Sequence, residues 1–539
     1  MDDARMEELL AAAPDVWGGA ALLAFSAIDG ETDAEFGLVA RTSTEDLGLS
    51  VVLPGRAEVR FSEAPPLSGR LAGDFFEVHA QDGRVRGAYV DAHHLLIEGP
   101  CNVVECDRDV AAVQDRDRTL IGARRRFNVS AIDTDLDRAI AARARWLAER
   151  ELPNGLSETR TRTLRKALSV LKTNTCSPAG PMRHRWMTPD RWPHRWMWLW
   201  DSAFQAIGWR HLDVGVARDA IEAVLDAQHD DGRVSHTAGP ERISDITQPP
   251  LLAMAALEID AAAADDAWLA DLYPRLCRYV EWDFAHRDGD GDGLLEWHMS
   301  DDPDSRSGES GMDNSPRFDS GAALNSPDFS AYAAAEYEHL AAMARRLGRE
   351  DEAARWDERA RATRSRIDER LWSEELGLYV DRDVRKGRPM NVPTAAGFLP
   401  LVCGAPSPDR AGRLARHLDD PETFGTELPV AGAPPADRKR YSPDKWRGPA
   451  WANVNWLIAR GFARYGLTDA AARIRDRTLE HIERWYERTG CLWEYYDTTG
   501  ERPPSHLLRR GRREPEPPHM TIADYGWTAA VYVDWLIGS

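Results

Sequence analysis

The stretch Ser307-Gly-Glu-Ser-Gly-Met-Asp-Asn-Ser-Pro-Arg-Phe-Asp-Ser320 interrupts a long helical region near the middle of the chain. Its Gly, Ser and Pro residues are too frequent for a helix to continue, so the sequence predicts a loop. The loop carries the carboxylates of Glu309, Asp313 and Asp319 and the guanidinium of Arg317. A solvated acidic loop is the simplest interpretation. Loops held by a rigid helical frame commonly carry function, however, so we expect a helical fold with a loop-built site.

Apolar residues at helical spacing predict helices on both sides of this loop. In Val214–Gln228, for example, Ala217, Ile221 and Val224 fall on one face. About a dozen such segments, one of them over residues 391–403, alternate with long and short loops, and the sequence lacks a short solenoid-type repeat. The pattern predicts a mainly α fold, in which residues 157–539 form a closed toroid of inner and outer helices.

The first 125 residues have a strand-like pattern. Short runs rich in β-branched and aromatic residues alternate with turns. Asp82-Gly83 joins Phe76–Ala80 to Val85–Val90, which is a strong hairpin signal. We interpret residues 1–125 as an antiparallel β-sandwich domain with a structural or substrate-bordering role, and residues 126–156 as a linker helix.

The composition excludes several classes of partner. The chain has 539 residues, 43% hydrophobic and 29% charged, with a formal net charge of -21, which is typical of a soluble globular protein. This charge disfavours nucleic acid and anionic membranes as partners. The acidic N-terminus lacks an apolar signal core, and the six cysteines are scattered. We therefore expect a cytoplasmic protein without a nucleic-acid or membrane partner, and the sequence leaves the oligomeric state open.

Tryptophan is unusually frequent, with 20 residues. Several lie in Thr188–Phe204, interleaved with arginine and histidine, and flat aromatic surfaces suit the apolar faces of sugars. In this stretch Asp201 follows Trp200 at the predicted start of a helix, where it either caps the helix or binds sugar hydroxyls. Gln248 precedes two prolines that suit a first helical turn, and is a candidate hydrogen-bonding residue at the rim of the site.

A pair of carboxylates is the central expectation for the site. Glu494 lies between aromatic residues, and such an apolar setting prepares a carboxyl group for proton transfer. Hydrolysis of a glycosidic bond requires one carboxyl group as acid and a second across the sugar. We select Asp313 and Glu494 for these roles, with Asp201 and Glu309 as reserves.

The run Asp288-Gly-Asp-Gly-Asp-Gly293 resembles the start of a calcium-binding loop. Its twelfth position is Met299 instead of the glutamate of an EF-hand. An acidic glycine turn is therefore the preferred interpretation, and a structural calcium ion held by Asp288, Asp290 and Asp292 is the alternative. We expect that no cofactor is required.

Four motifs resemble the loops of glycoside hydrolase family 63. The similarity is greatest to its bacterial α-glucosidase and mannosylglycerate/glucosylglycerate hydrolase branch, which is related to trehalases and glucoamylases. It covers roughly residues 155–539 with the motifs in the same order, and is specific for the clan more than for the substrate. The motifs are Trp192-Pro-His194 with Trp198-Leu-Trp-Asp-Ser202, Ser310-Gly-Met-Asp-Asn-Ser-Pro-Arg317, Trp446-Arg-Gly-Pro-Ala-Trp451 and Trp493-Glu-Tyr-Tyr-Asp497.

The resemblance implies an (α/α)6 barrel and an anomer-inverting mechanism, with Asp313 as general acid and Glu494 as general base. It also implies a set of residues around the bound sugar. The candidate substrate-binding residues, including those taken from within the same motifs, are Trp200, Asp201, Gln248, Asn314, Arg317, Trp446, Arg447 and Trp451. The β-rich residues 17–125 depart from the short glycerate-type hydrolases, whereas larger glucosidases of this group commonly have such a domain.

The expected function is that of an inverting, exo-acting α-glycosidase, similar to an α-glucosidase, which acts on a short α-linked oligosaccharide or glycoside. One alternative is an inverting glycoside phosphorylase, in which phosphate replaces the activated water and Glu494 has no role. The others are a mannosylglycerate or glucosylglycerate hydrolase and a non-catalytic carbohydrate-binding protein. The sequence does not predict the sugar, the linkage or the leaving group.

Overall fold

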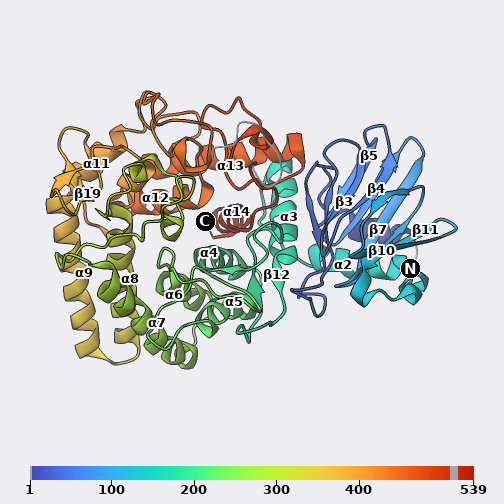
Figure 1. Cartoon of the computed structure of the whole chain (residues 1–539), viewed down its shortest axis with the longest axis horizontal. Coiled ribbons are helices and arrows are strands. Elements are labelled where there is room, and N and C mark those ends of the chain that lie inside the picture. The colour runs from blue at the N-terminus through green and yellow to red at the C-terminus, as the bar shows by residue number, and fades with distance from the viewer. Residues whose placement is uncertain (1–2, 510–519, 539) are drawn as a thin grey trace.

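The N-terminal part of the chain is an antiparallel β-sandwich (Figure 1). The computed structural model describes residues 3–509 and 520–538, and begins with helix α1 (Asp3–Leu10). One sheet has the strand order β1-β2-β3-β4-β9 and the other β10-β11-β8-β7-β6-β5. The strands are β1 Leu22–Ala24, β2 Val39–Thr42, β3 Leu47–Leu53, β4 Ala57–Ser62, β5 Ser68–Leu71, β6 Phe75–Ala80, β7 Gly83–Asp91, β8 His94–Glu98, β9 Asn102–Cys106, β10 Val110–Asp115 and β11 Arg118–Ala123.

The predicted hairpin at Asp82-Gly83 is present as β6–β7. Ala80 pairs with Gly83, so the two-residue turn is Gln81-Asp82, one residue earlier than expected. Gly83 has φ +133°, a backbone conformation that favours glycine, which explains why glycine opens the second strand.

The C-terminal part is an (α/α)6 barrel (Figure 1). Among the described residues, twelve helices follow α2 (Leu136–Ala148), and the even-numbered ones contact one another in a closed inner ring. The inner helices are α4 Leu199–Trp209, α6 Leu252–Ala262, α8 Pro327–Arg346, α10 Pro400–Cys403, α12 Ala452–Arg464 and α14 Gly526–Ile537. The outer helices are α3 Glu158–Thr173, α5 Val214–Asp226, α7 Asp266–Arg287, α9 Glu350–Arg370, α11 Pro408–Arg416 and α13 Thr468–Thr489.

The sequences of the helices explain their places in the two rings. Every residue of α4 is buried, and its sequence is apolar on nearly all sides. The outer helix α9 buries only a stripe of residues and exposes many charged ones. A helix that is apolar all round belongs in a core, whereas an amphipathic helix covers one. The alternation of the two kinds of sequence therefore produces the double ring.

One predicted helix is much shorter in the structure. Of residues 391–403, only Ala395–Phe398, as a 3-10 turn, and α10 are helical. Pro400 occupies the start of α10, where its missing N–H costs nothing. Gly404 follows with φ +76°, and this left-handed conformation ends the helix.

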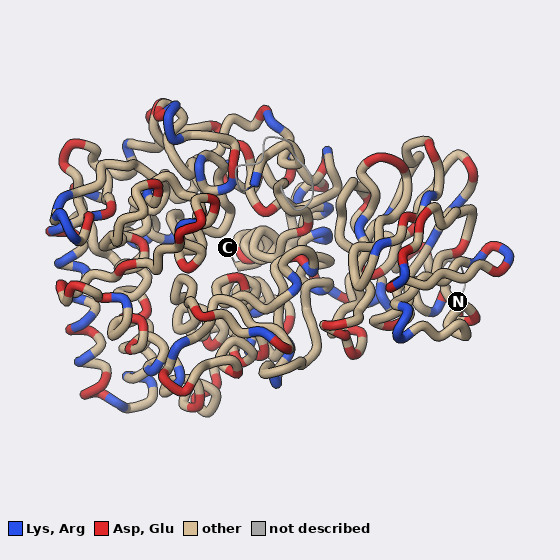
Figure 2. Tube along the Cα trace, in the orientation of Figure 1, with Lys and Arg blue, Asp and Glu red and all other residues tan. Residues whose placement is uncertain are grey.

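Buried ion pairs join the sandwich to the barrel. Lys172 of α3 donates from Nζ to Asp74 at 2.6 Å and contacts Asp29 at 2.8 Å, and both aspartates belong to the sandwich. Acidic and basic residues are interspersed along the trace of both parts (Figure 2). Within the described ranges, no helix is both long enough and apolar enough to cross a membrane.

Candidate active site

Loops that connect the inner and outer helices meet in a small pocket. The pocket brings together residues from all four motifs, although these lie far apart in the sequence. The predicted residues that line it are Trp200, Asp201, Gln248, Asp313, Trp446, Trp451 and Glu494.

Aromatic rings form one wall of the pocket. The rings of Trp446 and Trp451 stack with centroids 3.6 Å apart and an interplanar angle of 1°. Trp200 packs against Trp446 at 6.1 Å, and Trp527 lies edge-on to Trp200 at 5.4 Å. The Trp446 indole Nε1 is buried and has no hydrogen-bond partner among the described residues. The wall therefore offers apolar ring faces, which suit the apolar face of a sugar.

Asp313 is held on one side of the pocket by a lysine that sequence reasoning did not select. Lys445 donates from Nζ to the carboxylate of Asp313, and its side chain is only 5% exposed. A lysine is rarely buried without a carboxylate partner. The sequence signal that could have pointed to Lys445 was its position directly before the Trp446–Trp451 motif. The ammonium group places a positive charge beside this carboxylate.

Glu494 is held by an arginine, which makes its environment less apolar than expected. Its aromatic neighbours are buried as predicted, but Arg509 also donates from Nη1 to the Glu494 Oε2. The backbone amide of Glu494 donates to the Ile522 carbonyl at 2.9 Å, and its carbonyl accepts from Trp527 Nε1 at 3.1 Å. Arg509 lies outside the four motifs, so no sequence signal pointed to this contact.

Asp201 lines the pocket and does not cap α4. The N-cap of this helix is Trp198, and no side chain caps it. Burial raises the pKa of Asp201 well above its ordinary value, and the charges of Asp190 and Glu494 raise it further. The Asp201 Oδ1 lacks a partner within the part of the chain that the structure describes. A protonated carboxyl group in this position is suited to hydrogen-bonding a sugar hydroxyl.

The structure does not bring Arg317 into the lining of the pocket, where we expected it to contact the sugar. The side chain is fully buried and lies outside the pocket, where it donates to Asp328 and, at 3.0 Å, to Asp381. The sequence showed a basic residue in an active-site motif, but not that two carboxylates converge on it from outside the motif.

Asn314 and Arg447 also lie outside the pocket lining. The side chain of Asn314 accepts from the Trp446 amide at 3.0 Å, so it holds the two loops together. Arg447 forms a two-pronged ion pair with Asp319 at 2.8 and 2.9 Å. Asn314 and Arg447 therefore position the loops, and the structure does not place them where they would contact substrate directly.

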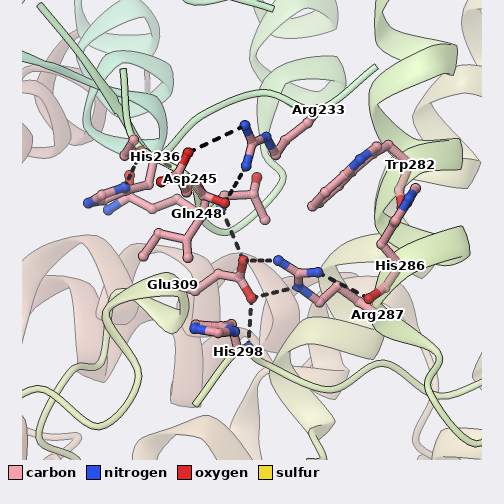
Figure 3. Close-up of polar contacts among 12 residues, drawn as sticks. Arg233, His236, Asp245, Gln248, Trp282, His286, Arg287, His298 and Glu309 are labelled. Carbon is pink, nitrogen blue, oxygen red and sulfur yellow. Dashed lines mark hydrogen bonds and ion pairs between the residues drawn. The ribbon is translucent and has the colours of Figure 1, made fainter. Parts of the chain in front are cut away.

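Glu309 is a structural anchor, which argues against its reserve role in the carboxylate pair (Figure 3). Its carboxylate accepts from Arg287 Nε at 2.9 Å and Nη2 at 2.7 Å. The backbone amides of Thr247 and His298 donate to it at 3.0 and 2.7 Å. With its oxygens occupied by four donors, Glu309 fixes the loop that carries Asp313.

Asp283 of α7 is a buried acid next to this anchor, and it gives a prediction about pH. Burial raises its pKa well above the ordinary value, and the charge of Glu309 adds to the effect. At a pH above the ordinary carboxyl range, the folded state therefore still holds a proton on Asp283 that the unfolded state has released. The free energy of unfolding accordingly decreases as pH rises.

We expect Asp283→Asn to remove this pH dependence. The free energy of unfolding of the variant, relative to wild type, should increase with pH by up to about 1.4 kcal/mol per pH unit above pH 4. Urea unfolding at several pH values measures it. The matched control is Asp271→Asn on the exposed face of the same helix. A difference between Asp283→Asn and wild type that stays constant with pH would contradict the assignment.

The acidic glycine turn differs in one ligand from the predicted set. Oxygens of Asp288, Asp290 and Glu296 lie within 4.8 Å of one another. Asp292 lies outside this group and pairs with Arg370, so the structure does not place it with the other predicted ligands. The backbone amide of Gly293 donates to Asp288 at 3.1 Å, and that of Gly289 donates to Glu296 at 2.7 Å. Hydrogen bonds of this kind stabilise the turn on their own.

Removal of metal tests whether the acidic glycine turn binds an ion. We expect dialysis against EDTA to leave the melting temperature unchanged, because a backbone amide already donates to each of the three carboxylates. A decrease that calcium reverses would instead show that an ion binds the folded state. The decrease should then disappear in Asp290→Asn, whose side chain is exposed.

Comparison with known proteins shows what the chain resembles. Residues 194–528 match the profile of the mannosylglycerate hydrolase MGH1-like glycoside hydrolase domain. The mannosylglycerate hydrolase of Thermus thermophilus is 29% identical over 461 residues, which cover 69% of this chain and 99% of that protein. The glucosylglycerate hydrolase of Mycolicibacterium hassiacum is 26% identical over 484 residues, 71% of this chain and 100% of that protein.

A solved structure matches the same share of the chain. The crystal structure of the family 63 mannosylglycerate hydrolase from Thermus thermophilus, in complex with Tris and D-glycerate, superposes with a TM-score of 0.58 at 25% identity. It covers 69% of this chain and 99% of its own. About three tenths of the chain is therefore additional to this relative.

Proposed function

Because this chain belongs to the mannosylglycerate hydrolase MGH1-like family of glycoside hydrolases, we propose that it is an inverting, exo-acting α-glycosidase. Its substrate is a short α-linked oligosaccharide or glycoside. Family membership rules out the non-catalytic alternative, since the chain is a glycoside hydrolase. The proposal concerns the mechanism and the substrate within that class.

The main support is that Asp313 and Glu494 line one pocket and are each paired with a cation. In the proposed reaction, Asp313 protonates the glycosidic oxygen as the bond to the anomeric carbon breaks. Glu494 removes a proton from a water that attacks the opposite face of the sugar, so the product is inverted. Arg509 binds Oε2 of Glu494, and in the proposed reaction Oε1 binds the water.

The charge of the pocket favours a neutral leaving group. Within the described residues, Lys445 and Arg509 are the lysine and arginine that line it, and each pairs with a catalytic carboxylate. A glycerate group would bring its own negative charge to this place. The named relatives favour the second candidate, mannosylglycerate or glucosylglycerate, because both kinds of hydrolase match the chain over about seven tenths of its length.

An activity screen separates these candidates. We expect the highest kcat/KM with a neutral α-linked disaccharide or glycoside, and a lower value with the two glycosylglycerates at equal concentration. NMR of the first product formed should show the anomer opposite to that of the substrate. A product with the substrate's own configuration would overturn the inverting mechanism, and release of a sugar phosphate that depends on added phosphate would favour a phosphorylase.

A further inference from the structure

A chain of contacts runs from the β-sandwich to the side of the pocket that holds Glu494, the proposed general base. We call this the base side. It begins at Arg41 of strand β2, which is 6% exposed. Arg41 donates from Nη2 to the carbonyls of Asp190, at 3.1 Å, and Trp192. Its Nη1 donates to the carbonyl of Ala523 at 3.3 Å. A single side chain of the sandwich thus grips two barrel loops, one before His194 and one before Tyr525.

The next contact fixes the ring of His194. Asp190 is fully buried, and its Oδ2 lies 2.6 Å from the His194 Nδ1. Its Oδ1 accepts from the His194 backbone amide at 3.1 Å. Both carboxylate oxygens are therefore used on the same residue, which defines the position and the orientation of the imidazole.

The last contact determines which nitrogen of His194 carries the proton. The Arg509 Nη2 lies 3.1 Å from the His194 Nε2. A guanidinium has donors and no acceptor, so Nε2 must accept and the proton must be on Nδ1. Asp190 favours the same tautomer, because its Oδ2 accepts from Nδ1–H. The other Arg509 nitrogen, Nη1, donates to Glu494.

We propose that Arg41, Asp190 and His194 position Arg509 against Glu494, and that the β-sandwich thereby completes the base side of the active site. The matched family profile begins at residue 194, so Arg41 and Asp190 lie outside it. The inference rests on the proposed role of Glu494 as general base. Arg41 and Asp190 act only through other residues and are positioning residues.

A second contact from the sandwich supports the same role. The backbone amide of Leu22 in β1 donates to the Asp524 Oδ2 at 2.8 Å. The Asp524 Oδ1 accepts from the Leu492 amide at 3.2 Å, two residues before Glu494. The sandwich therefore contacts both loops that carry the base and its arginine-binding histidine, and the base side of the pocket depends on how the domains pack.

Arg41→Met tests the proposal against a matched control. Lys172→Met also removes a buried contact between the domains, to Asp29 and Asp74, but does not touch these loops. We expect both variants to lower the melting temperature, and only Arg41→Met to lower kcat, by about 10- to 100-fold, with KM changed less than about twofold. Equal kcat values in the two variants would overturn the proposal.

His194 provides a second test if Arg41→Met does not fold. His194→Gln retains an acceptor for Arg509, whereas His194→Phe retains a ring without one. We expect the glutamine variant to keep about tenfold more of the kcat than the phenylalanine variant. Equal losses in both would contradict the positioning role.

The tautomer of His194 can be measured without turnover. The relay, meaning the chain of contacts from Arg41 through Asp190 and His194 to Arg509, can therefore be disproved separately from the proposed function. Selective 15N-histidine labelling, with His194→Gln to assign its signal, should show His194 with the proton on Nδ1. Arg41→Met should change this signal and Lys172→Met should not. A proton on Nε2 in the wild-type protein would exclude the proposed relay even if the enzyme is an active glycosidase.

Discussion

Asp313→Asn and Glu494→Gln will each lower kcat by about 10²–10⁴-fold, the usual contribution of a general acid or base. Both residues line the same pocket, and each loses only its ability to exchange a proton in these variants. The melting temperature and circular dichroism should stay close to wild type. Neutral exchanges at exposed positions elsewhere in the same loops, Asp304→Asn and Glu501→Gln, are the matched controls and should keep wild-type turnover.

An α-glycosyl fluoride separates the two roles. Fluoride leaves with little protonic assistance, so Asp313→Asn should regain much of its turnover on this substrate. Glu494→Gln should remain slow, because the attacking water still needs a base. The assignment would have to be reversed if Glu494→Gln alone recovered. If neither variant lost activity on an unactivated glycoside, the catalytic pair would lie elsewhere.

Much of the fold could be predicted because it depends on local patterns. The mostly apolar sequence of α4 and the amphipathic sequence of α9 are enough to distinguish inner from outer helices. The β6–β7 hairpin follows from one turn signal. Proline and glycine around α10 were the exception, since a periodic apolar pattern continued through residues that cannot extend a helix.

The site was predictable in its carboxylates and aromatics and not in their partners. Asp313 and Glu494 stand in recognisable motifs, but the cations that hold them depend on long-range folding. Arg509 reaches Glu494 from a segment without a motif, and Lys445 reaches Asp313 across more than a hundred positions. Motifs report which residues share a loop, whereas ion pairs depend on which loops meet.

The ion-pair partners of Arg317 likewise could not be predicted from its motif, and these partners lead to a large expected effect on stability. Arg317→Ala should lower the free energy of unfolding by about 3–5 kcal/mol, the usual cost of breaking a buried ion pair. The substitution leaves Asp328 and Asp381 facing each other without their shared cation. Burial already raises the pKa of Asp381 to about 6 even with Arg317 in place. Without the arginine, these carboxylates must take up protons or admit water.

The size and the pH dependence of the loss distinguish this role from substrate binding. Because protonation of the two carboxylates relieves their repulsion, Arg317→Ala should be less destabilised at pH 5 than at pH 8 in urea unfolding. Arg447→Ala is the control, since Arg447 pairs with a half-exposed Asp319 and should cost about 1 kcal/mol or less. Had Arg317 bound the sugar, its removal would raise KM and leave stability nearly unchanged. The buried cluster of Arg317, Asp328 and Asp381 predicts the reverse. The folded fraction should fall, while the KM of the remaining folded enzyme stays close to wild type.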